Sequence, residues 1–239
     1  MKKFKGMLLA CDMDDTLLDD SKQIPAENLR ALQPYSVMNG SLIYDENRKI
    51  LYCSGMPYET KEMIEHVLLN NSQFGCEVFT AETALIRQMS DHTLQHMHKL
   101  HLDYQMLSNE QFAKSATADW CTVNFTGEPA QITALTQDLL IRYPHVFDVT
   151  SSMPTFCEIT AAGVNKGSAL RNIVEYLPDV ERVFAIGDSY NDESMLQEAQ
   201  ISFAPANAEP EVLQNVNMTV SSNNDRAVAD IIEYLEKIG

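Results

Sequence analysis

Three short segments of the sequence carry residue types that could together transfer a phosphoryl group. In the first, Asp12 and Asp14 directly follow a short apolar run. A carboxylate at the end of a strand can attack phosphorus and form an aspartyl-phosphate. A second carboxylate two residues later could protonate the leaving alcohol and then activate water. The alternatives are an acidic turn and an EF-hand calcium loop, and the latter fails because Leu17 and Gln23 replace its required Gly and Glu.

The other two segments begin at Lys166 and Gly187. A lysine that opens a helix could hold a phosphate or orient a nucleophilic carboxylate, and the helix N-terminus itself attracts anions. Asp188 and Asp192 stand at a strand end and in the next helix, a spacing that suits Mg²⁺, which takes one or two carboxylates and keeps several waters. Taken alone, each segment also has an ordinary interpretation, as a solvated lysine or as a turn with a helix N-cap.

The elements around these segments predict a parallel α/β sheet. Residues 7–11 form a continuous apolar run, which is typical of a strand buried on both faces. The last third of the chain alternates strands at 182–186, 201–204 and 218–220 with helices at 168–176, 192–199, 209–215 and 227–237. Ligands bind at the carboxyl ends of the strands in such sheets, so we expect the three segments to converge there.

The middle of the chain has a different pattern, with helices expected at 58–70, 82–100 and 129–142 and strands at 120–125, 146–150 and 155–160. A helix at 26–33 and a hairpin at 41–55 precede this region. Helices and strands in this order suggest an α+β unit with an antiparallel sheet. We therefore expect a core domain made of residues 1–54 and 156–239, with a second domain inserted at 55–155.

The overall charge narrows the choice of partners. The 239 residues carry a formal net charge of −17, which argues against nucleic acid and anionic membranes because both attract Lys and Arg. An anionic substrate is compatible with this charge, since a bound cation can reverse the local sign. The apolar run near the N-terminus is too short for a signal peptide or a membrane span.

The cysteines and histidines suggest no metal site of their own. The five cysteines are odd in number, widely spaced and without a CxxC pair, so we expect reduced thiols in a cytoplasmic protein, mostly in the core. His92 and His96 have the spacing of a helical metal pair, but Thr93 stands where an HExxH motif has its Glu. We expect these histidines on an exposed polar helix.

Together, the three segments resemble the motifs of the haloacid dehalogenase (HAD) phosphatases, and within them the Cof-type subfamily. The first motif of that family, DxDxT, matches Asp12, Asp14 and Thr16. Its motif lysine matches Lys166, and its final motif, GDSxND, matches Gly187–Asp192 throughout. The resemblance covers both ends of the chain closely and the middle loosely, and motifs in this order are highly specific.

The resemblance implies an α/β fold, with a Rossmann-like parallel-sheet core and an inserted α+β cap of the C2 type. It also implies Mg²⁺-dependent hydrolysis of a small phosphate monoester, such as a sugar, nucleotide or cofactor phosphate, through an aspartyl-phosphate. In this scheme Asp12 is the nucleophile, Asp14 is the general acid and base, and Lys166 steadies the nucleophile and the phosphoryl group. We expect a monomer or a homodimer.

The same resemblance assigns the metal and substrate contacts. The Mg²⁺ ligands would be Asp12, Asp14, Asp188 and Asp192, with Asp14 acting through its backbone carbonyl. The substrate contacts would be Thr16, Ser41 and Asn191. Asp15 stands where many members of the family have Gly, and we expect this change to be tolerated if the carboxylate points away from the metal.

One motif of the family has no match in the sequence. The family has a phosphate-binding Thr or Ser at the end of its second core strand, where this chain runs from Leu32–Gln33 directly into Pro34–Gly40. A segment of about 30 residues, one βαβ increment, is missing there. Three explanations stay open: a true deletion, an incomplete record of the chain, or replacement of the motif by another residue. Among the candidate substitutes, Ser41 is favoured ahead of Asn39 and Ser54. The alternative function is therefore a catalytically impaired relative that binds a phosphorylated ligand or partner.

Overall fold

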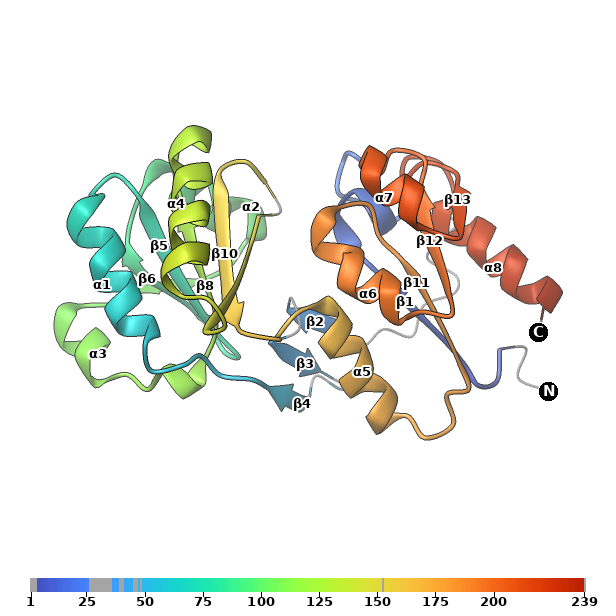
Figure 1. Cartoon of the computed structure of the whole chain (residues 1–239), viewed down its shortest axis with the longest axis horizontal. Helices are drawn as coiled ribbons and strands as arrows, with labels where there is room; N and C mark the ends of the chain where they lie inside the picture. The colour runs from blue at the N-terminus through green and yellow to red at the C-terminus, as the bar shows by residue number, and fades with distance from the viewer. Residues whose placement is uncertain are drawn as a thin grey trace. The chain divides into compact units, whose positions relative to one another are not determined.

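The structure is a computed structural model that describes residues 4–25, 36–38, 41–44, 47, 49–151 and 153–238. The chain divides into two compact units: unit 1 comprises Met1–Tyr35 and Lys166–Gly239, and unit 2 comprises Ser36–Asn165 (Figure 1). This arrangement confirms the predicted fold class, an α/β core with an inserted α+β unit. The boundaries differ from the predicted ones, because residues 36–54 and 156–165 belong to unit 2.

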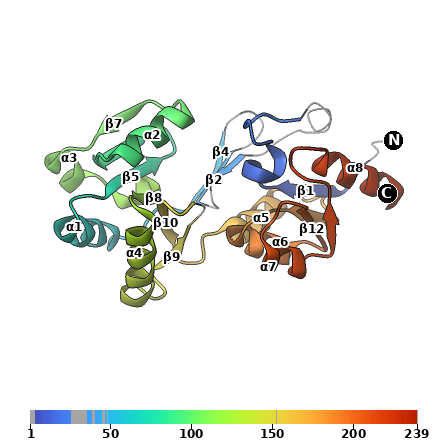
Figure 2. The same cartoon turned by 90° about the horizontal axis from the view of Figure 1, so that it is seen from above.

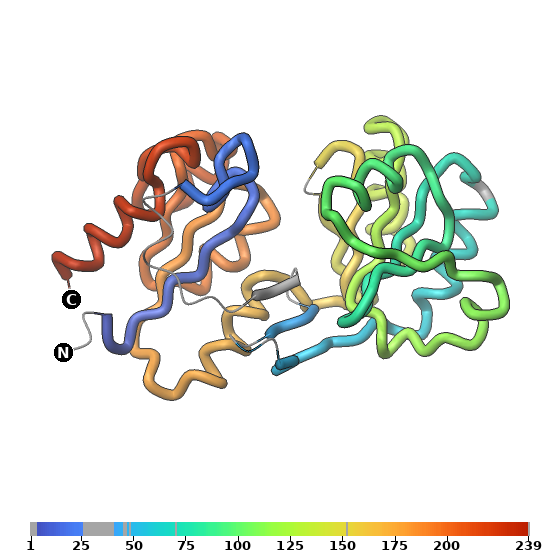
Figure 3. Tube along the Cα trace, turned by 180° about the vertical axis from the view of Figure 1, so that it is seen from behind, coloured from blue at the N-terminus to red at the C-terminus, as the bar shows by residue number. Residues whose placement is uncertain are grey.

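Unit 1 is built on a sheet of parallel strands in the order β1-β11-β12-β13. These strands span Met7–Cys11, Arg182–Ile186, Ile201–Pro205 and Met218–Val220. They lie where the sequence predicts them. Because β1 pairs with β11, the first and last parts of the chain share one sheet, and Figure 3 shows them side by side in blue and orange.

Helices cover both faces of this sheet. They are α5 (Lys166–Tyr176), α6 (Glu193–Glu198), α7 (Pro210–Asn215) and α8 (Ala227–Ile238). In β11, Val183 and Ala185 pack with α5, α6 and α7, whereas Phe184 and Ile186 pack with α8. Successive side chains of a strand point to opposite faces, so a strand covered on both sides needs a continuous apolar run.

Unit 2 contains a mixed sheet in the order β7-β6-β5-β8-β10-β9. Its strands span Gly75–Thr80 (β5), Ala84–Gln88 (β6), Tyr104–Met106 (β7), Trp120–Thr126 (β8), Phe147–Thr150 (β9) and Phe156–Ala161 (β10). Neighbouring strands are antiparallel, except that β6 and β7 are parallel. A separate antiparallel sheet consists of β2 (Ser36–Met38), β3 (Leu42–Tyr44) and β4 (Ile50–Cys53).

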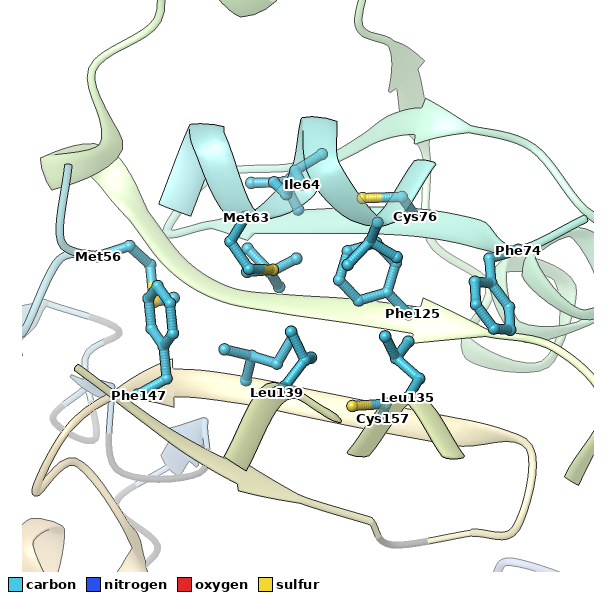
Figure 4. Packing of buried hydrophobic residues seen from close by; sticks show 14 of the residues in the cluster. Met56, Met63, Ile64, Phe74, Cys76, Phe125, Leu135, Leu139, Phe147 and Cys157 are labelled. Atoms are coloured by element: carbon cyan, nitrogen blue, oxygen red, sulfur yellow. The ribbon is translucent and has the colours of Figure 1, made fainter. Parts of the chain in front are cut away.

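Helices lie on both faces of the six-stranded sheet of unit 2. Helices α1 (Thr60–Asn70) and α4 (Pro129–Arg142) pack on one face and α2 (Asp91–Leu100) packs on the other, while α3 (Asn109–Lys114) precedes β8 (Figure 2). The first face carries the main core of the unit, where Met63, Phe125 and Leu139 pack together (Figure 4). Phe79 and Met97 belong to a smaller cluster under α2.

The sequence prediction is wrong for part of unit 2. A helix is predicted over 82–100, but Ala84–Gln88 forms β6, and the helix is confined to Asp91–Leu100. Ile86 is fully buried in this strand and pairs with β5, so sheet pairing overrides the local helical pattern. The helix predicted at 26–33 lies outside the described residues. No helix in the described part of the chain is long and apolar enough to cross a membrane.

Candidate active site

The carboxyl ends of β1 and β11 bring the first and third chemical segments together. The two strands are parallel neighbours, with Cys11 paired to Ile186. The N–H of Asp12 donates to the carbonyl of Ile186 over 3.0 Å, so the residue that follows β1 stays at the end of β11. Gly187 and Asp188 follow β11 at the same edge of the sheet. Parallel pairing therefore places Asp12 and Asp188 near each other.

Lys166 connects Asp12 with the third segment. It is the first residue of α5, and its ammonium donates to Asp12 Oδ1 over 2.5 Å and to Asp192 Oδ1 over 2.6 Å. The side chain of Asp192 is fully buried, and those of Lys166 and Asp12 are largely buried. The next residue, Gly167, lets α5 pack closely on α6, because a Cβ there would lie 2.4 Å from the carbonyl oxygen of Ser194.

Asp192 is held by the backbone of the loop that follows β11. Its Oδ2 accepts hydrogen bonds from the N–H groups of Asp188 over 3.0 Å and of Ser189 over 3.1 Å. Gly187 leaves the space for this carboxylate, because a Cβ there would lie 2.5 Å from Cγ of Asp192. The Gly-Asp-Ser-x-Asn-Asp segment therefore folds around its own last carboxylate and turns Oδ1 toward Lys166.

Three carboxylates form a cluster that could hold a cation. One oxygen from each of Asp12, Asp188 and Asp192 lies within 4.8 Å of the other two. Against these three negative charges, Lys166 supplies one positive charge inside the cluster. Carboxylate oxygens with an excess of negative charge are suitable ligands for Mg²⁺. The donor set therefore fits a divalent cation.

The same crowding shifts the pKa values of the groups in the cluster. Desolvation raises the pKa of Asp12 to about 6, with Lys166 opposing the shift and Asp192 adding to it. Desolvation and repulsion by Asp12 and Asp192 raise the pKa of Asp188 to about 7, although Thr16 donates a hydrogen bond to it. Burial alone would lower the pKa of Lys166, but Asp12 and Asp192 raise it above its usual value. Shifts of this kind are typical of functional sites, and a bound cation would favour the ionised acids.

The side chain of Asp14 lies outside this cluster. Its carboxylate is 68% exposed and lies 2.9 Å from the ammonium of Lys22, which also lies 3.0 Å from Asp15. Asp15 has a φ of +56°, in the left-handed region that favours glycine, the residue that the family resemblance implies at this position. The contact between Asp14 and the metal through its backbone carbonyl stays a prediction. No motif or spacing in the sequence indicates that Lys22 would be the partner of Asp14 and Asp15.

The residues predicted to contact the substrate have different surroundings. Thr16 is fully buried and its hydroxyl donates to Asp188 Oδ1 over 2.8 Å, so it orients a carboxylate of the cluster. Asn191 is half-buried and precedes Asp192 in the chain. Ser41 is buried in unit 2, next to β3, and its carbonyl accepts a hydrogen bond from the N–H of Ser54 over 2.9 Å. Their contacts with a substrate stay predictions.

Two asparagines outside the predicted site residues fix the loop that follows Asp12. The side-chain amide of Asn207 donates to the carbonyl of Asp15 over 2.8 Å, and its Oδ1 accepts from the N–H of Asn223 over 2.9 Å. Asn223 is itself buried and donates to the carbonyl of Leu18 over 3.1 Å. Both asparagines follow predicted strands of the parallel sheet, and this position is the signal by which the sequence could have identified them.

The position at which the family has its second motif, between Gln33 and Tyr35, lies outside the described residues. In the described part of the chain, β1 has β11 as its one partner in the sheet of unit 1. The next strand in the sequence, Ser36–Met38, forms β2 of the separate sheet in unit 2. The role of Ser41 as the phosphate-binding residue, in place of the Thr or Ser of the second motif, therefore stays a prediction.

Comparisons with known proteins identify relatives of the whole chain. The family model for the haloacid dehalogenase-like hydrolases matches residues 32–232. The chain is 27% identical over 240 residues to the 5-amino-6-(5-phospho-D-ribitylamino)uracil phosphatase of Bacillus subtilis, and the alignment covers 95% of this chain and 94% of that protein. Among solved structures, a haloacid dehalogenase-like hydrolase of Bacillus subtilis has a TM-score of 0.83 at 17% identity, with 96% of this chain and 99% of that chain covered. A subclass IIB sugar phosphatase has a TM-score of 0.80 at 17% identity, with 95% and 97% covered.

Proposed function

The chain belongs to the haloacid dehalogenase-like hydrolases of the Cof type and is a phosphatase, and from this premise we propose that it hydrolyses small phosphate monoesters through a phosphorylated Asp12. The observation that carries the proposal is the cluster in which Lys166 donates to Asp12 while Asp12, Asp188 and Asp192 crowd together. Phosphoryl transfer depends on positioning and on charge stabilisation, and this cluster can supply both.

Asp12 is the proposed nucleophile. In the first step, a carboxylate oxygen of Asp12 bonds to phosphorus and the bond to the alcohol oxygen breaks. Lys166 holds Asp12 through Oδ1 and would share the negative charge that the transferred phosphoryl group carries. The position of Asp12 directly after β1 supports this role, because the backbone there is fixed to β11 by the hydrogen bond to Ile186.

Asp14 is the proposed general acid and base. It would donate a proton to the leaving alcohol and then take one from the water that attacks the phosphorus of the aspartyl-phosphate. Its carboxylate is exposed and paired with Lys22, so we infer that the side chain leaves Lys22 to reach the leaving group. This rotation needs no change in the core of unit 1, because both side chains are on the surface loop.

Mg²⁺ is the proposed cofactor, with the side chains of Asp12, Asp188 and Asp192 and the backbone carbonyl of Asp14 as ligands. When bound, it would offset the repulsion between the carboxylates and the phosphate and would polarise a phosphate oxygen. Thr16 would keep Asp188 in place through its hydrogen bond. The backbone of the loop after β11 would do the same for Asp192.

The proposed substrate is a sugar, nucleotide or cofactor phosphate. The names of one relative, which acts on a phosphorylated ribityl pyrimidine, and of one solved neighbour, a sugar phosphatase, support this class. The net charge of −17 supports a protein that binds neither nucleic acid nor anionic membranes. A cytoplasmic monomer or homodimer completes the proposal.

The test is phosphate release from p-nitrophenyl phosphate and from a panel of sugar, nucleotide and cofactor phosphates, with and without Mg²⁺. The panel includes 5-amino-6-(5-phospho-D-ribitylamino)uracil. The Asp12→Asn variant is compared with Asp225→Asn, which changes an exposed aspartate in the same unit. Turnover that needs Mg²⁺, is abolished in Asp12→Asn and persists in Asp225→Asn would support the proposal.

A second chain, with a family-like second strand restored between Gln33 and Tyr35, distinguishes the alternatives. Turnover by the restored chain alone would mean that the missing motif is needed and that this chain is impaired. If neither chain releases phosphate, the alternative of a protein that binds a phosphorylated ligand or partner gains support. If a sugar phosphate is isomerised without phosphate release, the enzyme is a phosphomutase.

A further inference from the structure

Two cysteines that are far apart in the sequence lie in contact in unit 2. Cys53 is the last residue of β4 and Cys121 is the second residue of β8. Their Sγ atoms are 3.8 Å apart, although 68 residues separate them in the chain. Cys53 is exposed and Cys121 is fully buried. One thiol of the pair is thus open to solvent while the other lies directly behind it.

The backbone around the two cysteines holds them together. After β4, the N–H of Met56 donates to the carbonyl of Thr117 over 2.9 Å, just before β8 begins. Between these points, a Cβ on Gly55 would lie 2.7 Å from the carbonyl oxygen of Ala118. The chain that leaves β4 therefore packs directly against the chain that enters β8. The proximity of the two sulfur atoms follows from this packing and does not depend on the side-chain rotamers alone.

The two sulfur atoms are in van der Waals contact, at a separation of 3.8 Å. A disulfide needs a sulfur–sulfur distance of about 2.05 Å, and Cys pairs whose Cβ atoms face each other reach it by side-chain rotation. Closing the bond from 3.8 Å therefore requires the sulfur atoms to approach by about 1.8 Å, through rotation about the Cα–Cβ bonds and a shift of the strand ends.

The other three cysteines lack this combination of contact and exposure. Desolvation raises the pKa of the thiols of Cys11, Cys76 and Cys157 well above the usual value. Desolvation, together with the neighbouring Cys53, also raises the pKa of Cys121 to about 12. Because the thiolate is the reactive form and solvent must reach it, a dissolved oxidant meets Cys53 first.

We propose that Cys53 and Cys121 form a redox-modification site, in which a hydroperoxide oxidises Cys53 and Cys121 then closes an intramolecular disulfide. In the first step, the Cys53 thiolate sulfur bonds to one peroxide oxygen, the O–O bond breaks and hydroxide leaves, which gives a sulfenic acid. In the second step, the sulfur of Cys121 attacks that of Cys53, the S–O bond breaks, and the hydroxyl group leaves with the Cys121 proton as water. The two thiols together lose two electrons, and hydrogen peroxide is reduced to two molecules of water.

The disulfide would tie the three-stranded sheet of unit 2 to its six-stranded sheet. Cys53 ends β4 of the first sheet and Cys121 lies in β8 of the second. A link across 68 residues restricts the unfolded chain and so favours the folded state. A dithiol reductant would reverse the modification by thiol–disulfide exchange. This inference does not depend on the proposed phosphatase mechanism.

The test treats the full-length protein with hydrogen peroxide and counts the free thiols after denaturation. The five thiols of the chain should fall to three, and dithiothreitol should restore the lost pair. Peptide mapping should then find one cross-linked pair of peptides, which contain Cys53 and Cys121. The oxidised protein should unfold at a temperature several degrees higher than the reduced protein, because the loop it closes is long.

Single variants separate the two steps. Cys53→Ser, at an exposed position, should keep its four remaining thiols under the same treatment. Cys121→Ser should stop after the first step, so that Cys53 is trapped as a sulfenic acid by dimedone. Cys157→Ala is the control, because it removes a buried thiol and should still form the disulfide. The proposal would be overturned if the wild type kept all five thiols after peroxide treatment. A disulfide between two chains, or between a different pair of cysteines, would also overturn it.

Discussion

Both units of the molecule bury ionisable side chains, but they balance the charges differently. In unit 1, Lys166 pairs with Asp12 and Asp192, and Asp188 lies in the same cluster, so three acids stand against one ammonium group. In unit 2, one acid meets one imidazole: Oε2 of the fully buried Glu77 lies 2.8 Å from Nδ1 of His96.

The surroundings of the second pair are also different. His96 is covered by two rings, with centroid distances of 6.2 Å to Phe79 and 4.5 Å to Phe156. Desolvation raises the pKa of Glu77, and His96 opposes this shift. The other carboxylate oxygen, Oε1, meets no hydrogen-bond donor among the residues that the structure describes. The pair is therefore enclosed by the sheet and α2, with a single acid facing a single ring.

The comparison shows that burial of ionisable groups does not by itself identify a ligand-binding site. The better indicator is a buried cluster in which acidic groups outnumber basic ones. A single buried acid that already has a hydrogen-bonding partner is weak evidence for function. A cluster with surplus negative charge is unstable until a cation binds, so it is expected where a protein binds one. The histidine prediction also shows the limit of spacing alone, because His96 is 12% exposed and contacts Glu77, where an exposed polar helix is predicted.

The largest expected effect is the loss of activity in Asp12→Asn. The amide is a poor nucleophile, so phosphate release should fall by more than about 10³-fold. The melting temperature without Mg²⁺ should not fall, because one of the crowded carboxylates is neutralised. Phosphate release and thermal unfolding measured on the same preparation test both statements. Residual activity within tenfold of the wild type would show that Asp12 is not the nucleophile.

The next largest effect is expected for Lys166→Met. Without the ammonium group, nothing on residue 166 stabilises the negative charge of the transferred phosphoryl group, so activity should fall by about 10²–10³-fold. The change also leaves Asp12 and Asp192 without the ammonium group that they share, so the melting temperature in EDTA should fall, and Mg²⁺ should recover part of the loss. Lys114→Met is the control, because that side chain is 74% exposed and pairs with Glu110 on the surface. Equal melting temperatures for both variants in EDTA would contradict the comparison.

The raised pKa values in the carboxylate cluster of unit 1 should make the stability of the protein depend on pH. The pKa of Asp12 is raised to about 6 and that of Asp188 to about 7, whereas both are near 4 in an unfolded chain. Between these values the folded state binds more protons, so the stability of the metal-free protein falls as pH rises. Lys166 adds no slope in this window, because its raised pKa keeps it charged throughout.

Thermal unfolding in EDTA at about pH 5 and about pH 8 measures this slope. The melting temperature should be higher at the lower pH, and Mg²⁺ should remove most of the difference by binding the ionised acids. Asp188→Asn should show a smaller difference than the wild type, because one of the shifted acids is gone. A metal-free protein that is more stable at the higher pH would show that other groups dominate.

A smaller effect, confined to stability, is expected for His96→Leu. The change leaves the buried Glu77 without its partner, so the free energy of unfolding should fall by about 1–3 kcal/mol. His92→Leu is the matched control one turn earlier on α2: its partner Glu128 is 73% exposed, so the loss should stay below about 1 kcal/mol. Trp120 is the single tryptophan and is buried in unit 2, so its fluorescence reports denaturant unfolding there. Equal losses would remove the distinction between the two pairs.

The smallest effect is expected for Asp15→Gly. Glycine relieves the positive φ of this residue, while the contact with Lys22 is lost, and both changes are small at an exposed loop. The free energy of unfolding should change by less than about 1 kcal/mol. Activity should stay within a few-fold of the wild type, since this carboxylate lies outside the cluster. A large loss of activity would mean that Asp15 takes part in the site.

The sequence predicts unit 1 better than unit 2. Strand Arg182–Ile186 lies where it is predicted, because a continuous apolar run followed by Gly-Asp is a strong local pattern. Ala84–Gln88 is predicted as helix and forms a strand, because its state depends on pairing with β5, which is not visible locally. The helix α4, Pro129–Arg142, lies where the sequence predicts it, and Pro stands in its first turn.

The sequence by itself determined the residue types of the site and the elements that present them. Asp12, Lys166, Asp188 and Asp192 are identified by short motifs next to strands and helix starts, and these are local features of the chain. Only the tertiary structure decided their partners. Lys166 meets Asp12 across 154 residues, Glu77 meets His96 across 19 and Cys53 meets Cys121 across 68. The physical reason is that contacts between distant segments depend on how sheets and helices pack, and a local sequence pattern does not determine that packing.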